Sequence, residues 1–423
     1  MKPSRVRQEL LQVGCAVDGT GMHCAPACVL IEQGVVLAVG SPQQIGEVPD
    51  AVVRQLSEWV VMPPFANAHA HLDLSMLTGL AVVAREHGFS VWLDRVRTGR
   101  PSSEQGLRDA VLRGIELSRI GGVGWIGDIA GRRSMASFEA LADSPMHGVS
   151  YIEVFGLCGD LQREAVAFVQ SLRPRSRNGV QLGISPHAPY TAGALTYQAA
   201  LQLPMPFSTH LSESAEELEC MLHGRGPMFD FALSLGVVPE QIQVVGRHPV
   251  PWFLEQASAW RAHHVARAIS LAHVNEIETN MFESLAASGM VVAHCPRSNA
   301  FFGRPGVRGE GHRWREMLAA GVRVALATDG MPSLDREDRI TPLDDARLIW
   351  KRGGAQASQL LAMISLHGLA AMALATQQGV LRVGASHGLI GFEVADCARG
   401  FAAVLDSDAA PLWLLQTSKP KIA

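Results

Sequence analysis

From about residue 60 onward, short apolar runs rich in β-branched residues alternate eight times with stretches of helical periodicity. Parallel strands joined by helices are what such an alternation predicts, and eight units of this kind close into a barrel. The eight runs comprise residues 60–62, 123–128, 149–155, 180–184, 206–209, 268–272, 290–293 and 322–328. We therefore expect an α/β protein with a (β/α)8 barrel of the TIM type.

The two ends of the chain lack this alternation. The segment 28–40 predicts a β-hairpin with Gln33 and Gly34 near its turn. Residues after about 385 again form short runs that are typical of strands. We expect residues 1–60 and 385–423 to form one small β-sandwich domain, beside a barrel domain of residues 61–384.

Composition and charge exclude several classes of protein. Hydrophobic residues make up 48% of the 423 residues and charged residues 18%, too apolar a balance for intrinsic disorder. A formal net charge of −4 offers no basic surface for nucleic acid. No apolar run reaches the roughly 18 residues that a membrane helix needs. The N-terminus lacks an apolar signal segment and the seven cysteines are odd in number, so we expect a reduced, cytoplasmic protein.

Histidines follow two of the apolar runs. His69 and His71 are two residues apart, so on a strand both would face the same side and could bind one divalent metal. A chance pair in a turn is the alternative. His210 follows the run 206–209, and Glu213 stands three residues later, where a carboxylate could move protons beside a metal-bound water. The same residues could instead begin a helix with an acidic first turn.

Other predicted strands also end in polar residues. His273 follows the run 268–272 and Asp329 follows the run 322–328, while His187 and Arg297 follow two more strands. A carboxylate at the end of a buried strand is costly unless it is paired or bound to a metal, or caps the next helix. TIM-type barrels build their sites at the carboxyl ends of the strands. Polar residues at six such ends predict a site there.

Together these motifs resemble the amidohydrolase superfamily, in the branch that contains chlorohydrolases and deaminases of nucleosides and bases. The resemblance extends from the N-terminal hairpin through VMPPFANAHAH (61–71) to about residue 380. It weakens near the end, where relatives carry a G-x-x-x-x-G-x-x-A-D type of motif and this chain has GLIGFEVAD (388–396). It implies an enzyme that binds a divalent metal and a small-molecule substrate, and it is compatible with a homodimer.

The resemblance implies a role for each matching residue. The metal ligands would be His69, His71, His210 and Asp329. The acid–base groups would be Glu213, His273 and Asp329. The substrate pocket would be lined by His187, Arg297, Glu153 and Trp92.

Deamination would follow from these roles. A bound metal lowers the pKa of water from about 15.7 to about 7. Asp329 and His273 would take the proton of the attacking water, and Glu213 would protonate the ring nitrogen next to the attacked carbon. Ammonia would then leave. Hydrolytic loss of chloride or an alkylamine would use the same groups.

The scarcity of lysine limits the kind of metal site. Some relatives hold two metals bridged by a carbamylated lysine, but this chain has no lysine between Lys2 and Lys351. A bridge from Glu153 or Cys158 stays open. We expect a single metal, with Glu153 beside it or in the pocket. Three histidines and an aspartate suit zinc, and ferrous iron fits the same set.

Three segments resemble aminodeoxyfutalosine deaminases: HLDLS (71–75) with Asp in place of Glu, FSVW (89–92) and HCPRSN (294–299). Those enzymes deaminate the adenine of a nucleoside that carries a carboxyphenyl ketone, on a route to menaquinone. Arg297 could bind its carboxylate or could tie its own loop. The segment DGMPS (329–333) differs from the commoner D-S-x-A-S.

The expected function is a metal-dependent deaminase of an aminated purine, with aminodeoxyfutalosine as the leading substrate. Deamination of adenosylhomocysteine, methylthioadenosine or guanine stays open, as does triazine chlorohydrolysis. A metal-binding barrel without catalytic activity is the alternative from another class.

Overall fold

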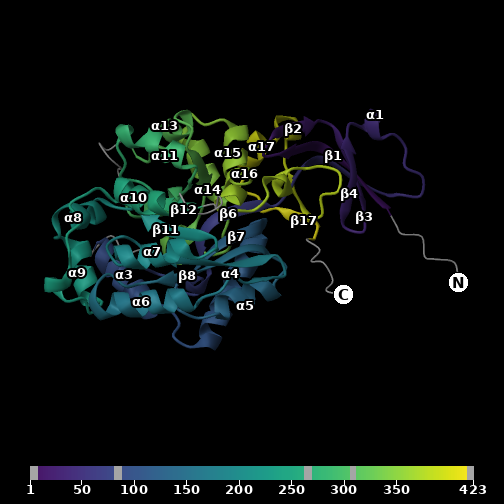
Figure 1. The fold of residues 1–423 in the computed structure, drawn as a ribbon. Coiled ribbons are helices and arrows are strands. Elements are labelled where there is room, and N and C mark those ends of the chain that lie inside the picture. The colour runs from purple at the N-terminus through teal and green to yellow at the C-terminus, as the bar shows by residue number, and fades with distance from the viewer. Residues whose placement is uncertain (1–7, 81–87, 262–268, 305–310, 417–423) are drawn as a thin grey trace.

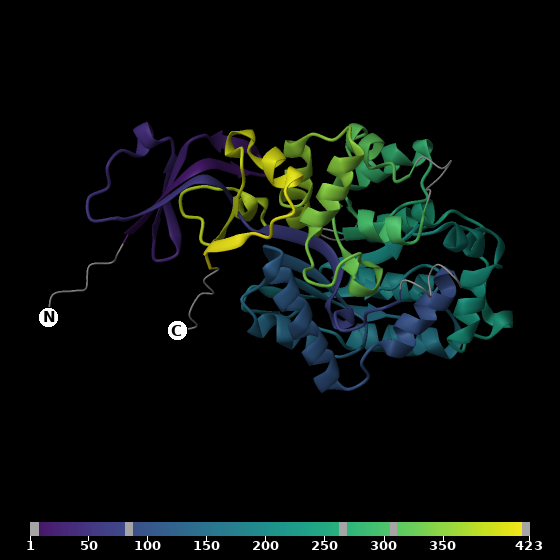
Figure 2. The same ribbon diagram turned by 180° about the vertical axis from the view of Figure 1, so that it is seen from behind.

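Two β-sheets organise the computed structural model, which describes residues 8–80, 88–261, 269–304 and 311–416. One sheet is curled and surrounded by helices, and the other is built from the two ends of the chain (Figure 1). Seen from behind, the strands of both chain ends lie side by side (Figure 2). Among the described residues, no helix has the length and apolar character needed to span a bilayer.

The curled sheet carries the parallel strands that the sequence predicts. Its strands are β6 (Phe65–His71), β7 (Val123–Ala130), β8 (His147–Val154), β9 (Ser176–Arg177), β10 (Val180–Pro186), β11 (Phe207–Leu211), β12 (Ile269–His273), β13 (Val291–His294), β14 (Arg323–Leu326) and β15 (Asp329–Gly330). All pair in parallel except β9, which is antiparallel to β10.

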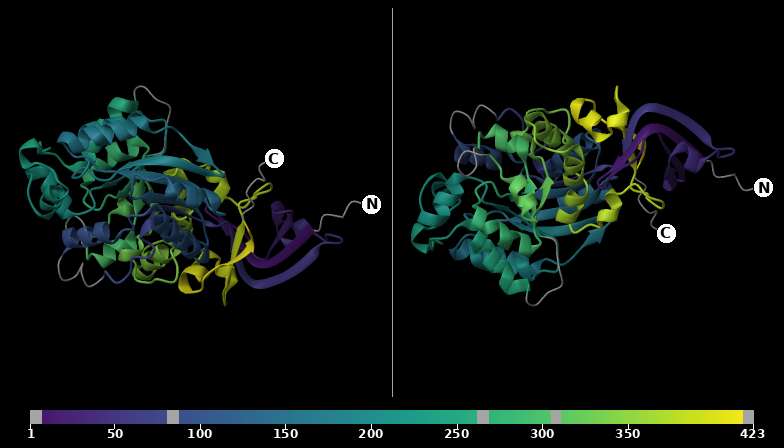
Figure 3. Two further views of the ribbon diagram at one scale, coloured as in Figure 1. Left: turned by 90° about the horizontal axis from the view of Figure 1, so that it is seen from below. Right: turned by 90° about the horizontal axis from the view of Figure 1, so that it is seen from above.

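The two ends of this sheet come from neighbouring residues. The order is β14-β13-β12-β11-β10-β8-β7-β6-β15, and only Ala327 and Thr328 separate β14 from β15. The Thr328 N–H also donates to the carbonyl of His69 in β6 (3.2 Å). The sheet therefore returns on itself, which is consistent with a TIM-type barrel (Figure 3).

Helices connect successive strands and lie outside the curled sheet (Figure 3). Those of the barrel region are α3 (Phe89–Gly99), α4 (Glu104–Ile120), α5 (Ala136–Asp143), α6 (Gly159–Ser171), α7 (Ala194–Gln202), α8 (Ala215–His223), α9 (Pro227–Ser234), α10 (Pro249–Arg261), α11 (Phe282–Ser288), α12 (Pro296–Phe301), α13 (Trp314–Ala319), α14 (Pro342–Arg352), α15 (Ala357–Met363) and α16 (Leu366–Ala371). Short 3-10 turns are η1 (Leu72–Leu74), η2 (Pro239–Gln241), η3 (Thr279–Met281), η5 (Met331–Ser333) and η6 (Thr376–Gly379).

The second sheet joins the two chain ends. Its strands are β1 (Gln8–Asp18), β2 (Gly21–Cys24), β3 (Ala27–Glu32), β4 (Val35–Gly40), β5 (Val52–Met62), β16 (Leu389–Glu393) and β17 (Leu412–Leu415). Strand β16 pairs antiparallel with β5, which brings the C-terminal segment onto the N-terminal strands. The helices α1 (Pro42–Ile45) and α17 (Phe401–Asp406) and the turn η7 (Cys397–Arg399) complete these segments.

The expected β-sandwich is not confirmed, because the described strands of the two chain ends belong to one sheet. The hairpin is confirmed as β3 and β4, with Gln33 and Gly34 both at positive φ in the turn between them. The domain boundaries at residues 60 and 385 stay a prediction. Residues 1–7 and 417–423 of the predicted small domain lie outside the described residues.

Seven of the eight predicted runs fall on strands of the curled sheet, and the first does not. Residues 60–62 end β5, which pairs with β1 and β16 of the second sheet. Pro63 and Pro64 lack the N–H groups that a ladder needs, so they separate β5 from β6. The first strand of the curled sheet is β6, which carries His69 and His71. Ala268, at the start of the sixth run, lies outside the described residues.

Candidate metal and active site

The predicted polar residues meet in one cavity at the carboxyl ends of the parallel strands. Its volume is about 430 Å³, within the range of small-molecule sites. Of the residues predicted from the sequence, those that line it are His71, Trp92, Glu153, His187, His210, Glu213, His273 and Asp329. They come from β6, α3, β8, β15 and the ends of β10, β11 and β12, far apart in the sequence.

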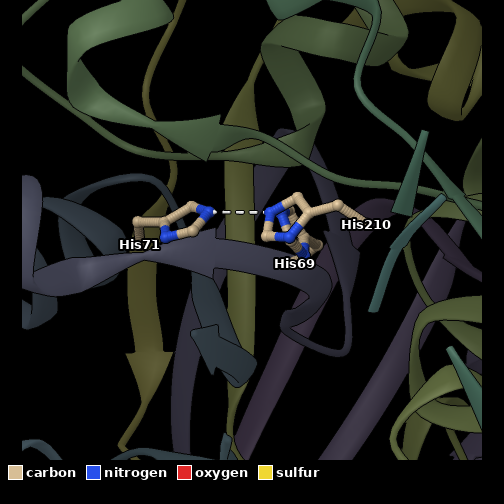
Figure 4. Close-up of side chains that lie close together, drawn as sticks. All are labelled: His69, His71 and His210. Carbon is tan, nitrogen blue, oxygen red and sulfur yellow. Dashed lines mark hydrogen bonds between the residues drawn. The ribbon is translucent and has the colours of Figure 1, made fainter. Parts of the chain in front are cut away.

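Three histidines form the centre of the site. Single ring nitrogens of His69, His71 and His210 all lie within 4.8 Å of one another, and the Nε2 atoms of His71 and His210 are 3.2 Å apart (Figure 4). Nδ1 of His210 lies 3.0 Å from the carbonyl oxygen of His187, which can only accept, so Nδ1 donates and Nε2 is free to bind. Both ring nitrogens of His69 are buried without a hydrogen-bond partner among the described residues.

Asp329 faces the same centre. Its Oδ1 lies 3.6 Å from Nε2 of His71 and 4.0 Å from Nε2 of His69. Its Oδ2 accepts hydrogen bonds from the hydroxyls of Ser298 (2.7 Å) and Ser333 (3.3 Å), which orient the carboxylate. Burial raises the pKa of Asp329, and the charge of Glu213 adds to this.

The donor set fits a divalent metal. Tetrahedral zinc ligands at about 2.1 Å from the ion stand about 3.4 Å from each other, close to the spacing between His71 and His210. Burial lowers the pKa of His69 and His71 well below 6.5, so both are neutral, which is the form that binds metals. An unpartnered buried imidazole such as His69 is costly alone, and a metal would satisfy it.

Backbone strain is concentrated at this site. Four residues have positive φ values, between 52° and 71°, which residues other than glycine rarely adopt: Ser212, His273, Val274 and Asp329. All four directly follow, end or begin strands at the carboxyl edge of the sheet. Strain of this kind is retained where the surrounding structure overrides it, and it commonly marks a functional site.

The second part of the site is a pair of buried titratable side chains, Glu213 and His273. Oε1 of Glu213 lies 3.6 Å from Nε2 of His273 and accepts a hydrogen bond from Nη1 of Arg304 (2.8 Å). Burial raises the pKa of Glu213, but neighbouring groups, first among them the charged Arg304, outweigh it and leave that pKa below its usual value. Burial lowers the pKa of His273, and both of its ring nitrogens are unpartnered within the described ranges. Glu213 is therefore ionised and His273 neutral.

Arg100, directly after α3, also lines the cavity, and no sequence pattern predicted it there. Its guanidinium donates to Glu153 Oε2 (3.2 Å) and lies 3.2 Å from Asp73 Oδ2 and 3.4 Å from Nδ1 of His71. It thus links the helix that carries Trp92 to a candidate metal ligand. A single arginine after a helical stretch belongs to no motif that would predict its place in a site. Its partner Asp73, by contrast, is part of the HLDLS segment. Glu153 also faces His187 and His210, both at 4.0 Å.

Part of the cavity wall is aromatic. His187 stacks on Phe155, with ring centroids 4.6 Å apart, and its Nδ1 lies 2.6 Å from the hydroxyl of Thr191. Trp92 is buried against Phe302 at 4.8 Å. Both predicted pocket residues therefore belong to the aromatic part of the cavity wall.

The expectation for Arg297 is corrected, because this residue does not line the cavity. Its Nε donates to Asp345 (3.0 Å), Nη1 to Asp335 (3.4 Å) and Nη2 to the carbonyl of Thr341 (3.1 Å). Arg297 was expected to bind a carboxylate of the substrate, but it binds the carboxylates of Asp345 and Asp335 instead. Arg297 ties α12 to α14, the role left open as its alternative.

Two deaminases are similar to this chain in sequence. Over 336 residues the chain is 28% identical to aminodeoxyfutalosine deaminase of Deinococcus radiodurans, covering 75% of this chain and 76% of that protein. It is 24% identical to 5-methylthioadenosine/S-adenosylhomocysteine deaminase of Thermococcus kodakarensis, covering 89% and 83%.

Solved structures share the fold. Aminofutalosine deaminase of Helicobacter pylori superposes with a TM-score of 0.74 at 18% identity, covering 98% of this chain and 100% of that one. A zinc-bound adenosine deaminase from Xanthomonas campestris gives a TM-score of 0.67 at 16% identity, covering 100% and 96%. The model of the amidohydrolase family matches residues 60–396, which include every residue of the cavity discussed above. The chain therefore belongs to the amidohydrolase family.

Proposed function

We propose that the chain is a metal-dependent hydrolytic deaminase that acts on the adenine of a nucleoside. One observation carries the proposal. A buried histidine cluster that fits a metal, His69, His71 and His210, faces Asp329 in the same cavity as the Glu213–His273 pair. Metal ligands and proton carriers around one cavity are what hydrolysis of a C–N bond needs.

His69, His71, His210 and Asp329 would hold the metal, and zinc is the expected ion. When bound, such an ion makes a water molecule more acidic and more nucleophilic. Asp329, whose pKa is raised by burial, is suited to accept the proton of the attacking water. Neutral His273 is the other acceptor, and it lies 3.6 Å from Glu213.

Glu213 would carry the proton to the substrate. Because its pKa is low in the free protein, Glu213 starts ionised and must receive the proton that it later donates. It would then protonate the ring nitrogen next to the attacked carbon, which makes that carbon more electrophilic. The other proton of the water, taken up by Asp329 or His273, would pass to the amino group; the C–N bond would then break, ammonia would leave and the carbonyl would form.

Aminodeoxyfutalosine is the leading substrate. Two observations favour it over other adenine nucleosides: the identity to the Deinococcus radiodurans enzyme over three quarters of the chain, and the aromatic cavity wall of Trp92, Phe155 and His187. Adenosylhomocysteine or methylthioadenosine is the second candidate, because relatives of that name match up to 89% of the chain. Triazine hydrolase shares only the fold, at a TM-score of 0.69.

Two expectations about the setting of the enzyme accompany this proposal. All seven cysteines are free, which supports a reduced, cytoplasmic location. The homodimer stays a prediction.

The test is ammonia release by the purified, zinc-loaded protein. Aminodeoxyfutalosine, adenosine, adenosylhomocysteine, methylthioadenosine, guanine and a chlorotriazine are compared at equal concentration. We expect the highest kcat/KM with aminodeoxyfutalosine. Release from none of them, with the metal content verified, would contradict the deaminase proposal and favour a barrel without this activity.

A further inference from the structure

Two consecutive arginines line the cavity, and among the described residues neither forms an ion pair with a carboxylate. Arg132 and Arg133 stand in the loop between β7 and α5, and both side chains are exposed. We propose that they form an anion-binding subsite, which takes a carboxylate or phosphate at the far end of the substrate from the adenine. This proposal rests on the proposed function and specifies the substrate class for the same cavity.

The loop is held against the metal-side residues. The N–H of Gly131 donates to Asp73 Oδ2 (3.1 Å), and the Gly131 carbonyl accepts from Nη1 of Arg100 (3.1 Å). A Cβ at position 131 would overlap the Arg100 guanidinium, so only glycine permits this approach. The two arginines that follow are therefore anchored next to the site.

The charges of the other cavity arginines are balanced. Arg100 is paired with Asp73 and Glu153, and Arg97 is paired with Asp94 (2.6 Å). The adjacent loop arginines have no ion pair of this kind among the described residues, and Arg132 only adds, behind Arg100, to the positive field that opposes the rise that burial causes in the pKa of Asp73.

Arg132 and Arg133 donate only to neutral groups. Nη2 of Arg132 bonds the carbonyl of Arg100 (3.3 Å), and Nη2 of Arg133 bonds the carbonyl of Phe155 (3.0 Å). Arg133 also lies over the ring of Phe168, 5.2 Å from its centroid. Within the described ranges, no carboxylate oxygen comes within 4.0 Å of either guanidinium. Two adjacent positive charges on a concave surface attract an anion, and guanidinium binds carboxylate and phosphate in a bidentate manner.

The bond between Arg133 and Phe155 places this charge beside the aromatic wall. Phe155 stacks on His187, whose own carbonyl holds the candidate metal ligand His210. Apolar side chains of Leu157, Leu161 and Phe231 line the same cavity. A ligand that fits this arrangement has an adenine at the histidines, an apolar or aromatic spacer, and a terminal anion.

Matched substrates test the proposal. We compare aminodeoxyfutalosine with its carboxamide, and AMP with adenosine, in the wild type and in the double variant R132Q/R133Q. The wild type should prefer the acid over the amide by about 10-fold or more in kcat/KM, mainly through KM, because a hydrogen bond between two charged groups is stronger than one to a neutral amide. The double variant should lose this preference and keep the rate with the amide. The control R97Q, which removes an already paired charge at the same cavity, should keep it.

Three outcomes show whether the subsite exists and whether it binds phosphate as well as carboxylate. A preference for AMP over adenosine that R132Q/R133Q abolishes would support the subsite with phosphate as its ligand. Equal rates with acid and amide in the wild type, or an equal loss for both in the variant, would overturn it.

Direct binding separates this proposal from the proposed function. The affinities of the acid and the amide are measured by calorimetry on metal-loaded protein. Suppose that no compound is deaminated, but the wild type binds the acid more tightly than the amide and R132Q/R133Q does not. The subsite is then supported and the deaminase proposal fails. Equal affinities would refute the subsite whatever the activity.

Discussion

Two buried polar clusters in this molecule differ in how completely their hydrogen bonds are made. In the arginine–aspartate cluster of Arg297, Arg339, Asp344 and Asp345, every guanidinium nitrogen of both arginines donates to a protein oxygen. In the histidine cluster of His69, His71, His210 and His273, four ring nitrogens of His69 and His273 have no partner within the described residues.

This difference distinguishes a cluster that stabilises the fold from one that belongs to a binding site. Buried polar groups are nearly always hydrogen-bonded, so a cluster that is complete within the protein holds elements together. A cluster left incomplete, next to strained backbone at His273 and Asp329, is arranged for a group that comes from outside. Four predictions test this contrast, from the largest expected effect to the smallest.

Replacing Glu213 by glutamine should abolish turnover and leave the metal bound. The amide cannot carry the proton to the ring nitrogen, and general acid–base groups contribute about 10²–10⁴-fold to rates. Ammonia release and metal analysis measure the two properties separately. The control is Glu216→Gln, the same change on α8 at a residue that does not line the cavity. An unchanged rate in Glu213→Gln would refute the role of Glu213.

Removing Arg297 should affect stability and not substrate binding. Arg297→Ala leaves the buried Asp345 with the backbone N–H of residue 297 but without its guanidinium partner, and breaking a buried pair costs about 3–5 kcal/mol. Urea unfolding measures this loss. Arg108→Ala, which removes an exposed pair with Asp143, should cost about 1 kcal/mol or less. If the Arg297→Ala protein is as stable as the wild type and has a raised KM, Arg297 binds substrate and this account of it is wrong.

Metal removal should destabilise only a protein with an intact histidine cluster. Zinc at about 100 times its Kd should stabilise the chelator-treated wild type by about 2.7 kcal/mol, because it binds the folded state. Thermal unfolding with and without zinc measures this shift. In His69→Ala the shift should disappear. The same shift in both proteins would place the zinc elsewhere.

The smallest effect concerns a charge pair in the second sheet. Oδ2 of Asp18 lies 2.5 Å from Nε2 of His23 and accepts from the N–H of Leu381, which joins the chain ends. The hydrogen bond to Asp18 raises the pKa of His23 above 6.5. The stabilisation is therefore fully present below about pH 6.5 and is lost as the pH rises through the raised pKa.

His23→Gln should lose this pH dependence, which we expect to amount to about 1 kcal/mol or less. Urea unfolding at pH 5.5 and pH 9 measures it in both proteins. An identical pH dependence in the variant would show that His23 does not contribute.

The strands and their terminal residues could be predicted from the sequence because they depend on local periodicity. His69 and His71 were recognised from a two-residue spacing, and Asp329 from its place after a buried run. Contacts between residues far apart in the sequence could not be predicted in this way. Arg100 and Arg304 reach Glu153 and Glu213 across 53 and 91 residues, and no local pattern reports such distances.

Arg297 shows a different limit, since an arginine that binds an internal carboxylate has the same sequence signature as one that binds a substrate. The first strand was misplaced for a third reason. The run 60–62 is as apolar and buried as a barrel strand, and only the two prolines after it mark the change of sheet.

The central claim is that the incomplete histidine cluster takes one divalent metal and that deamination depends on it. The most direct measurement is a titration of metal-free protein with zinc, in which bound zinc and ammonia release from aminodeoxyfutalosine are recorded together. We predict that the rate rises in proportion to bound zinc and reaches its plateau at one equivalent per chain. Full activity without metal, or a plateau only at two equivalents, would contradict this account.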